Sequence, residues 1–356
     1  METYEHGADI YTTAKKLGID ENLIIDFSSN INPLGIPQGI KEAYCNSLEL
    51  CEEYPDQHYR KLIEALSENE KVPNDFIFPS NGASESIFRI VQTINPKEAL
   101  ITSPTFGEYE EALDSVHSNI NYYPLKEGTN FKVNKDFLDH ITEKIDIIFL
   151  CNPNNPTGVV VDKSLLEMIL NKCLTTSTYF VLDESFIDFL YDSKNYSLVN
   201  KINLNKYLII LKSFTKIFAM PGIRLGYCIS SDANLISKLK KNGPPWNIST
   251  TSEKCGIAAV KEKQYIEKSV KYIISQRNYL IKELEKLELK VFPSKGNYIL
   301  FKFKGKFDLK KSLEKEGILI RSCYNYKGLD NHYYRIAVKK EFDNNILIDK
   351  LKKIIK

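Results

Sequence analysis

Short apolar runs alternate with helical patterns through the middle of the chain. Residues 99–103, 145–151, 179–182 and 207–211 are apolar runs of the length expected for buried strands. Helical spacing is found between them, for example over residues 163–173. Strands that alternate with helices predict an α/β fold with a mostly parallel sheet covered by helices on both faces. Ligands bind beyond the carboxyl ends of such strands, so the residues that follow these runs are the first candidates for chemistry.

The second half of the chain contains a boundary. Gly243, Pro244 and Pro245 cannot lie in the middle of a helix. Beyond them, residues 272–284 carry apolar side chains at helical spacing, and strands and helices then alternate to the C-terminus. We therefore expect an N-terminal arm over residues 1–35 that packs on the small domain and the active site, a large domain over residues 36–242, and a small α/β domain over residues 243–356.

Composition narrows the class of protein. The 356 residues carry a formal charge of only +2, so nothing indicates a nucleic-acid-binding surface. No apolar run reaches the ~18 residues that span a bilayer, and residues 1–9 lack the apolar segment of a signal peptide. A cytoplasmic enzyme with no membrane partner is therefore expected. The seven cysteines and five histidines are scattered singly, which predicts reduced thiols and no metal site.

The strongest candidate for chemistry is a lysine that follows the run 207–211. Lys216 comes after two hydroxyl residues, Ser213 and Thr215, and Arg224 lies eight positions further on. A lysine alone is usually a solvated surface charge. Here the hydroxyls and the arginine supply the donors of a phosphate site beside the amine. This setting suits a lysine that bonds covalently to a phosphate-bearing aldehyde cofactor.

Two further polar residues follow buried strands. Asp183 comes directly after the run 179–182, where a carboxylate is explained by a helix N-cap or a surface turn, and where a buried carboxylate would need a partner. Beside a pyridinium nitrogen, such a carboxylate would keep the ring protonated and able to accept electrons. Glu184 is expected to point the opposite way, because side chains alternate along a strand. Asn155 lies in the turn-rich segment 152–158, which is typical of a polar turn and also suits a donor to the cofactor's phenolic oxygen.

Two weaker signals complete this set. Gly82, Ala83 and Ser84 form a small-residue turn before an apolar helical pattern, which favours phosphate binding by backbone N–H groups. Helix capping by Ser84 and Glu85 explains the same residues. Phe106 follows the first strand and is explained either as core or as a flat partner that stacks on a heteroaromatic ring.

The order of these residues resembles fold type I pyridoxal 5′-phosphate (PLP) enzymes, the aspartate aminotransferase superfamily, over essentially the whole chain. The residues that carry the likeness are Gly82, Ala83, Ser84, Phe106, Asn155, Asp183, Lys216 and Arg224. The resemblance implies a large PLP-binding domain and a smaller α/β C-terminal domain, with Lys216 and Asp183 as catalytic residues. It also implies a homodimer with active sites at the interface, in which Tyr54 reaches the cofactor phosphate of the other subunit.

Two branches of the superfamily compete, the histidinol-phosphate aminotransferases and the L-threonine-O-3-phosphate decarboxylases of cobalamin biosynthesis. The segments that look like the decarboxylases are residues 6–10, 26–35, 183–189 and 318–338. Phe186 stands where the aminotransferases usually have a tyrosine that bonds the cofactor's phenolic oxygen. Residues 80–85 depart from the decarboxylase pattern and are nearer to that of the aminotransferases.

Four residues are candidates for binding a phosphorylated amino acid. The resemblance to the decarboxylases assigns His6 and Asn30 to the substrate phosphate. Arg321 and Arg335 are expected at strand ends of the C-terminal domain, after apolar stretches, where a buried guanidinium needs an anionic partner. Which arginine binds carboxylate and which binds phosphate is not decided by the sequence.

The expected reaction is PLP-dependent decarboxylation of L-threonine O-3-phosphate to 1-amino-2-propanol O-2-phosphate and carbon dioxide, with serine phosphate as a further possible substrate. One alternative is a class I/II aminotransferase, such as one for histidinol phosphate. A second is a catalytically silent fold type I domain used for binding or regulation. The presence of both Lys216 and Asp183 disfavours the silent domain.

Overall fold

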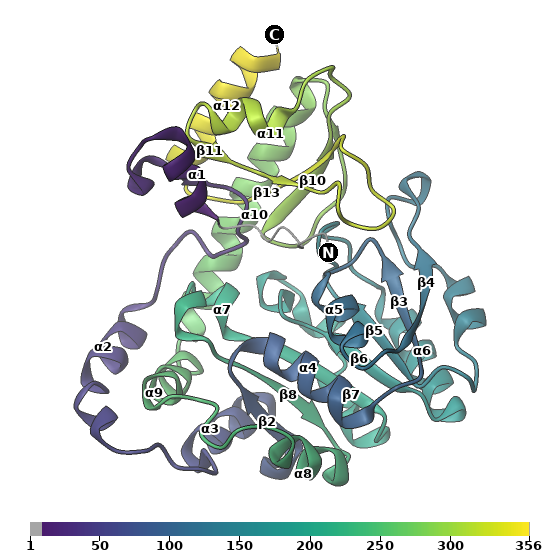
Figure 1. Ribbon diagram of the computed structural model, residues 1–356. Coiled ribbons are helices and arrows are strands. Elements are labelled where there is room, and N and C mark those ends of the chain that lie inside the picture. Colours follow the sequence, from purple (N-terminus) through teal and green to yellow (C-terminus); the bar gives the residue numbers. More distant parts are fainter. Residues whose placement is uncertain (1–8, 356) are drawn as a thin grey trace.

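The computed structural model describes residues 9–355, and a seven-stranded sheet lies at its centre (Figure 1). The strands are β2 (Ile77–Ser80), β3 (Glu98–Ser103), β4 (Asn119–Pro124), β5 (Ile147–Cys151), β6 (Tyr179–Asp183), β7 (Leu208–Ser213) and β8 (Gly226–Ser230). Their order across the sheet is β2-β8-β7-β6-β5-β3-β4. Neighbours are parallel except at β8, which is antiparallel to both β2 and β7. The mostly parallel sheet expected from the sequence is therefore present.

All four apolar runs form strands, with ends that differ by one or two residues from the expected ones. The largest difference is in β7, which continues beyond Leu211 because Lys212 and Ser213 pair with Tyr227 and Gly226 of β8. Hydrophobic patterning ends at Leu211, so the sequence gives no sign of these last two residues of the strand.

Helices cover both faces of the sheet, and the strands alternate their side chains between them. On one face, α4 (Gly82–Ile94), α5 (Glu108–Asp114) and α8 (Ala233–Lys241) share a core with Val181 of β6. On the other face, α6 (Lys163–Thr176) shares a core with Phe180 and Leu182. The same alternation continues at the end of β6, so Asp183 and the next residue, Glu184, lie on opposite faces.

The remaining helices frame the sheet and the C-terminal part of the chain. They are α1 (Ile10–Leu17), α2 (Gln38–Asn46), α3 (Arg60–Glu70), α7 (Phe214–Ile217), α9 (Thr250–Ala259), α10 (Lys263–Lys286), α11 (Leu309–Glu314) and α12 (Glu341–Ile355). Residues 243–245 lie in the connection between α8 and α9, and α9 packs against α2 and α3. The domain boundaries expected after residues 35 and 242 remain predictions.

A second, smaller sheet is formed near the C-terminus (Figure 1). It contains β9 (Lys290–Val291), β10 (Tyr298–Lys302), β12 (Arg321–Ser322) and β13 (Tyr333–Ala337), in the antiparallel order β12-β13-β10-β9. Beside it, β1 (Ile25–Asp26) pairs in parallel with β11 (Ile318–Leu319). The Ala337 N–H donates to the carbonyl of Phe27 at 2.8 Å, which places the next residues, Ser28 to Asn30, beside the smaller sheet.

The described residues contain neither a membrane-spanning helix nor a cluster of metal ligands. Over residues 9–355, no helix combines the length and the apolar character needed to cross a bilayer. In the same part of the chain, no group of three or more His, Cys, Asp or Glu side chains is placed to hold a metal ion.

Candidate active site

A cavity of about 350 Å³ lies between the carboxyl ends of β5, β6 and β7 and the smaller sheet. Twelve of the residues singled out from the sequence line it: Asn30, Ala83, Ser84, Phe106, Asn155, Asp183, Ser213, Thr215, Lys216, Arg224, Arg321 and Arg335. Gly82 lies directly behind the lining, in contact with Arg224. Tyr54 does not line this cavity, and His6 lies outside the described residues. Residues from the arm, the large sheet and the small sheet thus meet in one place.

The first turn of α4 is brought close to the end of β8 by two glycines. Gly82 has φ of +79°, and a Cβ there would lie 2.4 Å from Nη2 of Arg224. A Cβ on Gly226 would lie 2.5 Å from the backbone nitrogen of Ala83. Any larger residue would push the N-terminal turn of the helix away from Arg224. The backbone N–H groups of a helix start and a guanidinium therefore face the same corner of the cavity, a suitable place for a phosphate.

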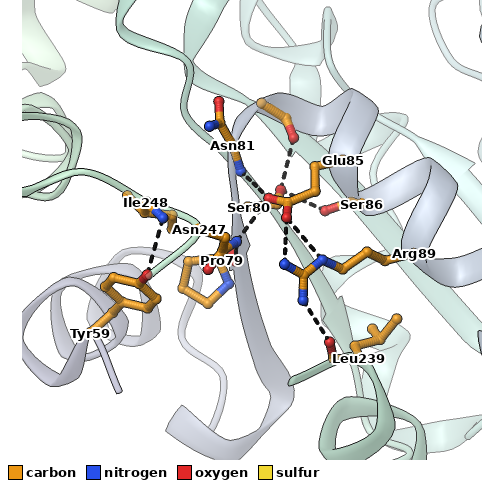
Figure 2. Close-up of polar contacts among 11 residues, drawn as sticks. Tyr59, Pro79, Ser80, Asn81, Glu85, Ser86, Arg89, Leu239, Asn247 and Ile248 are labelled. Atoms are coloured by element: carbon orange, nitrogen blue, oxygen red, sulfur yellow. Dashed lines mark hydrogen bonds and ion pairs between the residues drawn. The ribbon is translucent and has the colours of Figure 1, made fainter. Parts of the chain in front are cut away.

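Glu85 does not line the cavity and caps the start of this helix (Figure 2). Its carboxylate accepts a hydrogen bond from the backbone N–H of Asn81 at 2.5 Å. It also accepts hydrogen bonds from the side chains of Arg89 and Asn247. Ser84, by contrast, lines the cavity. Helix capping, one of the two explanations offered for this segment, therefore applies to Glu85. Phosphate binding, the other explanation, remains open to Ser84.

The turn that carries Lys216 is held by hydroxyls on one side and by the N-terminal arm on the other. Ser213 caps α7 by accepting from the N–H of Thr215 at 3.3 Å, and the two hydroxyls lie 2.9 Å apart. The buried Asn32 donates from Nδ2 to the carbonyl of Ile217 at 2.7 Å, and its backbone N–H donates to the carbonyl of Lys216. The lysine is therefore presented from a fixed backbone, with only its side chain free to move.

The surroundings of Lys216 favour its neutral amine. Burial lowers its pKa to about 8, and the positive charges of Arg335 and Arg224 act in the same direction, against the opposing charge of Glu108. Its ammonium lies 6.0 Å from the centroid of the Phe186 ring. A neutral amine is the nucleophilic form, and the lowered pKa increases its share near neutral pH over that of an ordinary lysine.

Asp183 is fixed by two donors and buried. Its Oδ2 accepts from the hydroxyl of Tyr109 at 2.5 Å, and its Oδ1 accepts from the N–H of Ser185 at 2.9 Å. Only 3% of the residue is exposed. Burial and the charge of Asp183 raise the pKa of Tyr109 well above its ordinary value, so the phenol remains a donor. Sequence reasoning missed Tyr109, because a tyrosine in the first turn of a helix gives no signal of its partner.

Glu184 points to the other face of the sheet, as strand alternation predicted. Its Oε2 lies 2.8 Å from Nζ of Lys212, and both residues are buried. Oε2 also accepts from the hydroxyl of Ser197, and Oε1 accepts from the N–H of Leu198. Burial lowers the pKa of Lys212, but the charges of Glu184 and nearby carboxylates outweigh it and raise that pKa overall. This ion pair joins β6 to β7 directly behind Asp183 and the Lys216 turn.

We expect Lys212→Met to destabilise the protein strongly. The substitution leaves the carboxylate of Glu184 buried without its counter-ion, which costs about 3–5 kcal/mol in the free energy of unfolding. Denaturant unfolding measures this change. The control is Lys201→Met, because Lys201 pairs with Glu167 at 3.1 Å while both side chains are about a third exposed. Such exposed pairs contribute about 0–1 kcal/mol, and equal losses in the two variants would contradict the role given to the buried pair.

Arg321 and Arg335 lie directly opposite each other on β12 and β13. Both are buried, with 6% and 5% of their surfaces exposed. Arg335 contacts the Oδ1 of Asn155, the carbonyl of Ser28 at 2.7 Å and the Tyr326 hydroxyl at 3.5 Å, so none of these partners is a carboxylate. Its Nε is buried with no hydrogen-bond partner. Arg335 is the third residue of its strand, which corrects the expectation that it lies at a strand end.

Aromatic rings and an amide complete the walls of the cavity. Phe106 meets the edge of Tyr109, with ring centroids 5.6 Å apart, and Phe186 meets the edge of Tyr298 at 5.0 Å. Asn155 uses its oxygen to accept from Arg335, so its amide nitrogen is the end suited to donate to a ligand. One wall thus offers flat apolar faces and a single amide donor.

The comparisons with known proteins agree with this geometry. Residues 23–351 match the family described as aminotransferase class I and II. The chain belongs to this family. It is 34% identical to the threonine-phosphate decarboxylase of Salmonella typhimurium, over 98% of this chain and 96% of that protein. It is 32% identical to the histidinol-phosphate aminotransferase of Methanococcus aeolicus, over 100% of this chain and 96% of that protein. The crystal structure of the histidinol-phosphate aminotransferase from Clostridium acetobutylicum matches with a TM-score of 0.87 and 33% identity, covering 92% of this chain and 98% of that chain.

Membership of the class I and II aminotransferase family makes this chain a fold type I enzyme with PLP as its cofactor. The residues present fit that cofactor. The helix start at Ala83 and Ser84, together with Arg224, offers donors for a phosphate, while a buried carboxylate and a lysine of lowered pKa face the same cavity. The fold and the cofactor expected from the sequence are therefore confirmed.

Proposed function

We propose that this PLP enzyme decarboxylates L-threonine O-3-phosphate, giving 1-amino-2-propanol O-2-phosphate and carbon dioxide. In this reaction the Cα–carboxylate bond breaks and a proton takes the place of the carboxyl group. Serine phosphate, which lacks only one methyl group, is a second substrate of the same class. The similarity to the Salmonella decarboxylase over nearly the whole chain supports the proposal.

The observation that carries the proposal is the cross-strand pair of buried arginines. Like charges directly opposite each other destabilise a sheet, and a buried cation without a carboxylate partner is costly. Arg321 and Arg335 lie opposite each other and both line the cavity, and Arg335 is buried with an amide, a carbonyl and a phenol as its hydrogen-bond partners. The Nε of Arg335 is a buried donor without a hydrogen-bond partner, so it could donate to a ligand. A ligand with two anionic groups, a carboxylate and a phosphate, would suit two guanidinium groups in one cavity, because a guanidinium fork matches either anion.

Further polar groups support a phosphorylated ligand at this end of the cavity. Asn30 is 4% exposed, and its Oδ1 is buried without a hydrogen-bond partner. Ser28 and Ser29 line the cavity beside it. An orphaned acceptor fits an amine, a water or a protonated phosphate oxygen. His6, assigned to the same phosphate by resemblance, remains a prediction.

The chain's own residues divide the chemical work. When bound, PLP supplies an aromatic ring that accepts the electrons released at the substrate's Cα. Asp183 would hold the proton on the ring nitrogen, and Ser213, Thr215 and Arg224 would hold the phosphate of the cofactor. Lys216 would bind the cofactor covalently and then carry a proton to Cα.

Orientation of the substrate decides which bond breaks. The two arginines would fix the carboxylate relative to Cα, so that the carboxylate rather than the hydrogen is the group in position to leave. Phe186 adds to this case, because it cannot form the hydrogen bond that a tyrosine would. If the arginines instead held Cα–H in the reactive position, the same residues would carry out transamination. An aminotransferase for histidinol phosphate is therefore the alternative, and the similarity to the Methanococcus aminotransferase supports it.

The test incubates the PLP-loaded enzyme separately with threonine phosphate, serine phosphate, and histidinol phosphate plus 2-oxoglutarate. We expect carbon dioxide from threonine phosphate without any 2-oxo acid, and no glutamate from histidinol phosphate. Both products are measured in every reaction. Glutamate from histidinol phosphate, with no carbon dioxide from either phosphoamino acid, would reject the decarboxylase and leave the PLP enzyme unaffected.

We further propose that the enzyme is a homodimer in which Tyr54 reaches the cofactor phosphate of the partner. Tyr54 is 79% exposed, and other large apolar side chains near it in the chain are also exposed, including Leu48 at 72% and Leu50 at 50%. An exposed group of apolar side chains is typical of a surface that a partner covers. The family to which the chain belongs supports the same arrangement.

Replacing Tyr54 with phenylalanine should weaken PLP binding by about 1 kcal/mol, the net contribution of one hydrogen bond. Fluorescence titration of the apoenzyme with PLP measures the dissociation constant, and light scattering measures the mass in solution. The substitution keeps the ring, so the dimer is expected to persist. A fully active monomer would contradict the proposed arrangement.

A further inference from the structure

A network of hydrogen bonds surrounds Glu85 in the first turn of α4 (Figure 2). Its centre is the carboxylate of Glu85, which receives four donors. Oε1 accepts from Nε and Nη2 of Arg89 at 2.8 and 2.6 Å. Oε2 accepts from the backbone N–H of Asn81 at 2.5 Å and from Nδ2 of Asn247 at 2.8 Å. One carboxylate therefore joins the cavity-lining turn to a segment more than 160 positions later in the chain.

Arg89 fixes the start of that later segment. Its side chain is 5% exposed, and Nη1 donates to the carbonyl of Leu239 at 3.0 Å. A Cβ on Gly243 would lie 2.1 Å from the Cζ of Arg89, so only glycine lets the chain pass this guanidinium. The segment from Leu239 to Asn247 is thus held at both ends by the Glu85–Arg89 pair.

The residue next to Asn247 touches Tyr54. Trp246 has φ of +53°, an uncommon conformation for a bulky residue, and its ring contacts that of Tyr54 at a tilt of 30°, with ring centroids 4.6 Å apart. On the other side of Asn247, the N–H of Ile248 donates to the hydroxyl of Tyr59 at 3.0 Å. Tyr59 and Tyr54 belong to the same connection between α2 and α3. A continuous series of contacts therefore runs from the start of α4, which lines the cavity, to Tyr54.

We propose that Asn247, held by Glu85, is a positioning residue that sets the place of Tyr54 through Trp246. This rests on the proposed function in one respect, the homodimer in which Tyr54 serves the partner's cofactor. Tyr54 is mostly exposed in its own subunit, and its ring contacts that of Trp246, which restricts where the Tyr54 hydroxyl can lie. Glu85 thereby acts on two sites. It caps α4, the proposed phosphate-binding helix of its own subunit, and it orders Tyr54, which would reach the cofactor of the partner.

A double-mutant cycle on PLP binding tests this. The full-length apoenzyme is titrated with PLP for the unsubstituted protein, Asn247→Ala, Tyr54→Phe and the double variant. Each single substitution should weaken binding by roughly five-fold, the equivalent of one hydrogen bond. If Asn247 acts through Tyr54, the double variant should bind no more weakly than Tyr54→Phe alone. A role limited to the local fold would instead give independent, multiplying losses, and that result would overturn the proposal.

Two further variants keep the test decisive. Asn242→Ala is the control, because Asn242 lies in the same segment but donates to Thr93 rather than to Glu85. Its PLP dissociation constant should be unchanged in both backgrounds. Trp246→Leu removes the contacting ring and should show the same dependence on Tyr54, which preserves the test if Asn247→Ala folds poorly. A Tyr54→Phe variant that binds PLP normally would also overturn the proposal, and the carbon dioxide assay reports on the proposed function independently of either result.

Discussion

Lys216→Ala is expected to abolish the covalent attachment of PLP and with it turnover. The purified protein is expected to be yellow, with an absorption band that borohydride bleaches by reducing the bond between cofactor and lysine. The alanine variant lacks the amine proposed to form this bond, which lies in the same cavity as Asp183, Arg224 and Phe186. We expect the rate to fall by several orders of magnitude, because the same group also carries the proton. Absorption spectra before and after borohydride, with peptide mapping of the reduced protein, measure the attachment.

Lys212→Arg is the matched control for this experiment. Lys212 is the nearest lysine in the sequence on the preceding strand, but its ammonium pairs with Glu184 on the other face of the sheet. Its conservative replacement should leave the borohydride-sensitive band in place. A reduced adduct that maps to any lysine other than Lys216 would reject the assignment of the whole site.

Arg335→Ala should lower kcat/KM for threonine phosphate by roughly 3 kcal/mol or more, on the order of a hundred-fold. The substitution removes one of two buried cations that would hold the anionic ends of the substrate. PLP should still attach, because Arg335 is not among the groups proposed to hold the cofactor's phosphate or ring nitrogen. Carbon dioxide release over a range of substrate concentrations gives kcat and KM separately.

The same variant should change the pH dependence of PLP attachment. Burial is the main reason that the pKa of Lys216 is lowered to about 8, and the charge of Arg335 is the next. Attachment needs the neutral amine, so its rate rises as the pH passes through this value. Removing the Arg335 charge raises the pKa and moves the rise to higher pH. Arg277→Ala is the control, because this buried guanidinium donates to the carbonyls of Lys295 and Gly296 outside the cavity.

Much of the site could be predicted because its chemistry follows strands that are easily recognised. Asp183 and Lys216 come after apolar runs, and the position of a residue after a parallel strand already places it at one edge of the sheet. The opposite orientations of Asp183 and Glu184 needed only the two-residue period of a strand. These inferences depend on local pattern, which a single sequence contains.

What the sequence did not reveal depends on contacts between distant residues. Tyr109 donates to Asp183 across 74 positions, and Asn247 donates to Glu85 across 162. Neither residue differs in local pattern from an ordinary tyrosine or asparagine. The cross-strand position of Arg321 and Arg335 was likewise hidden, because the pairing register of β12 and β13 is fixed by the connection between them.

The pairing of β1 with β11 has a consequence for biosynthesis. Ile25 is synthesised about 290 positions before its partner Ile318, which at typical elongation rates is an interval of roughly 15 to 60 s. During that time the arm that carries Asn30 and Asn32 has no strand to pair with. The backbone bonds that hold Lys216 from the arm side therefore form only late, after most of the large sheet has been translated. A nascent chain stalled before residue 318 would have its phosphate-binding turn but an unfinished substrate pocket.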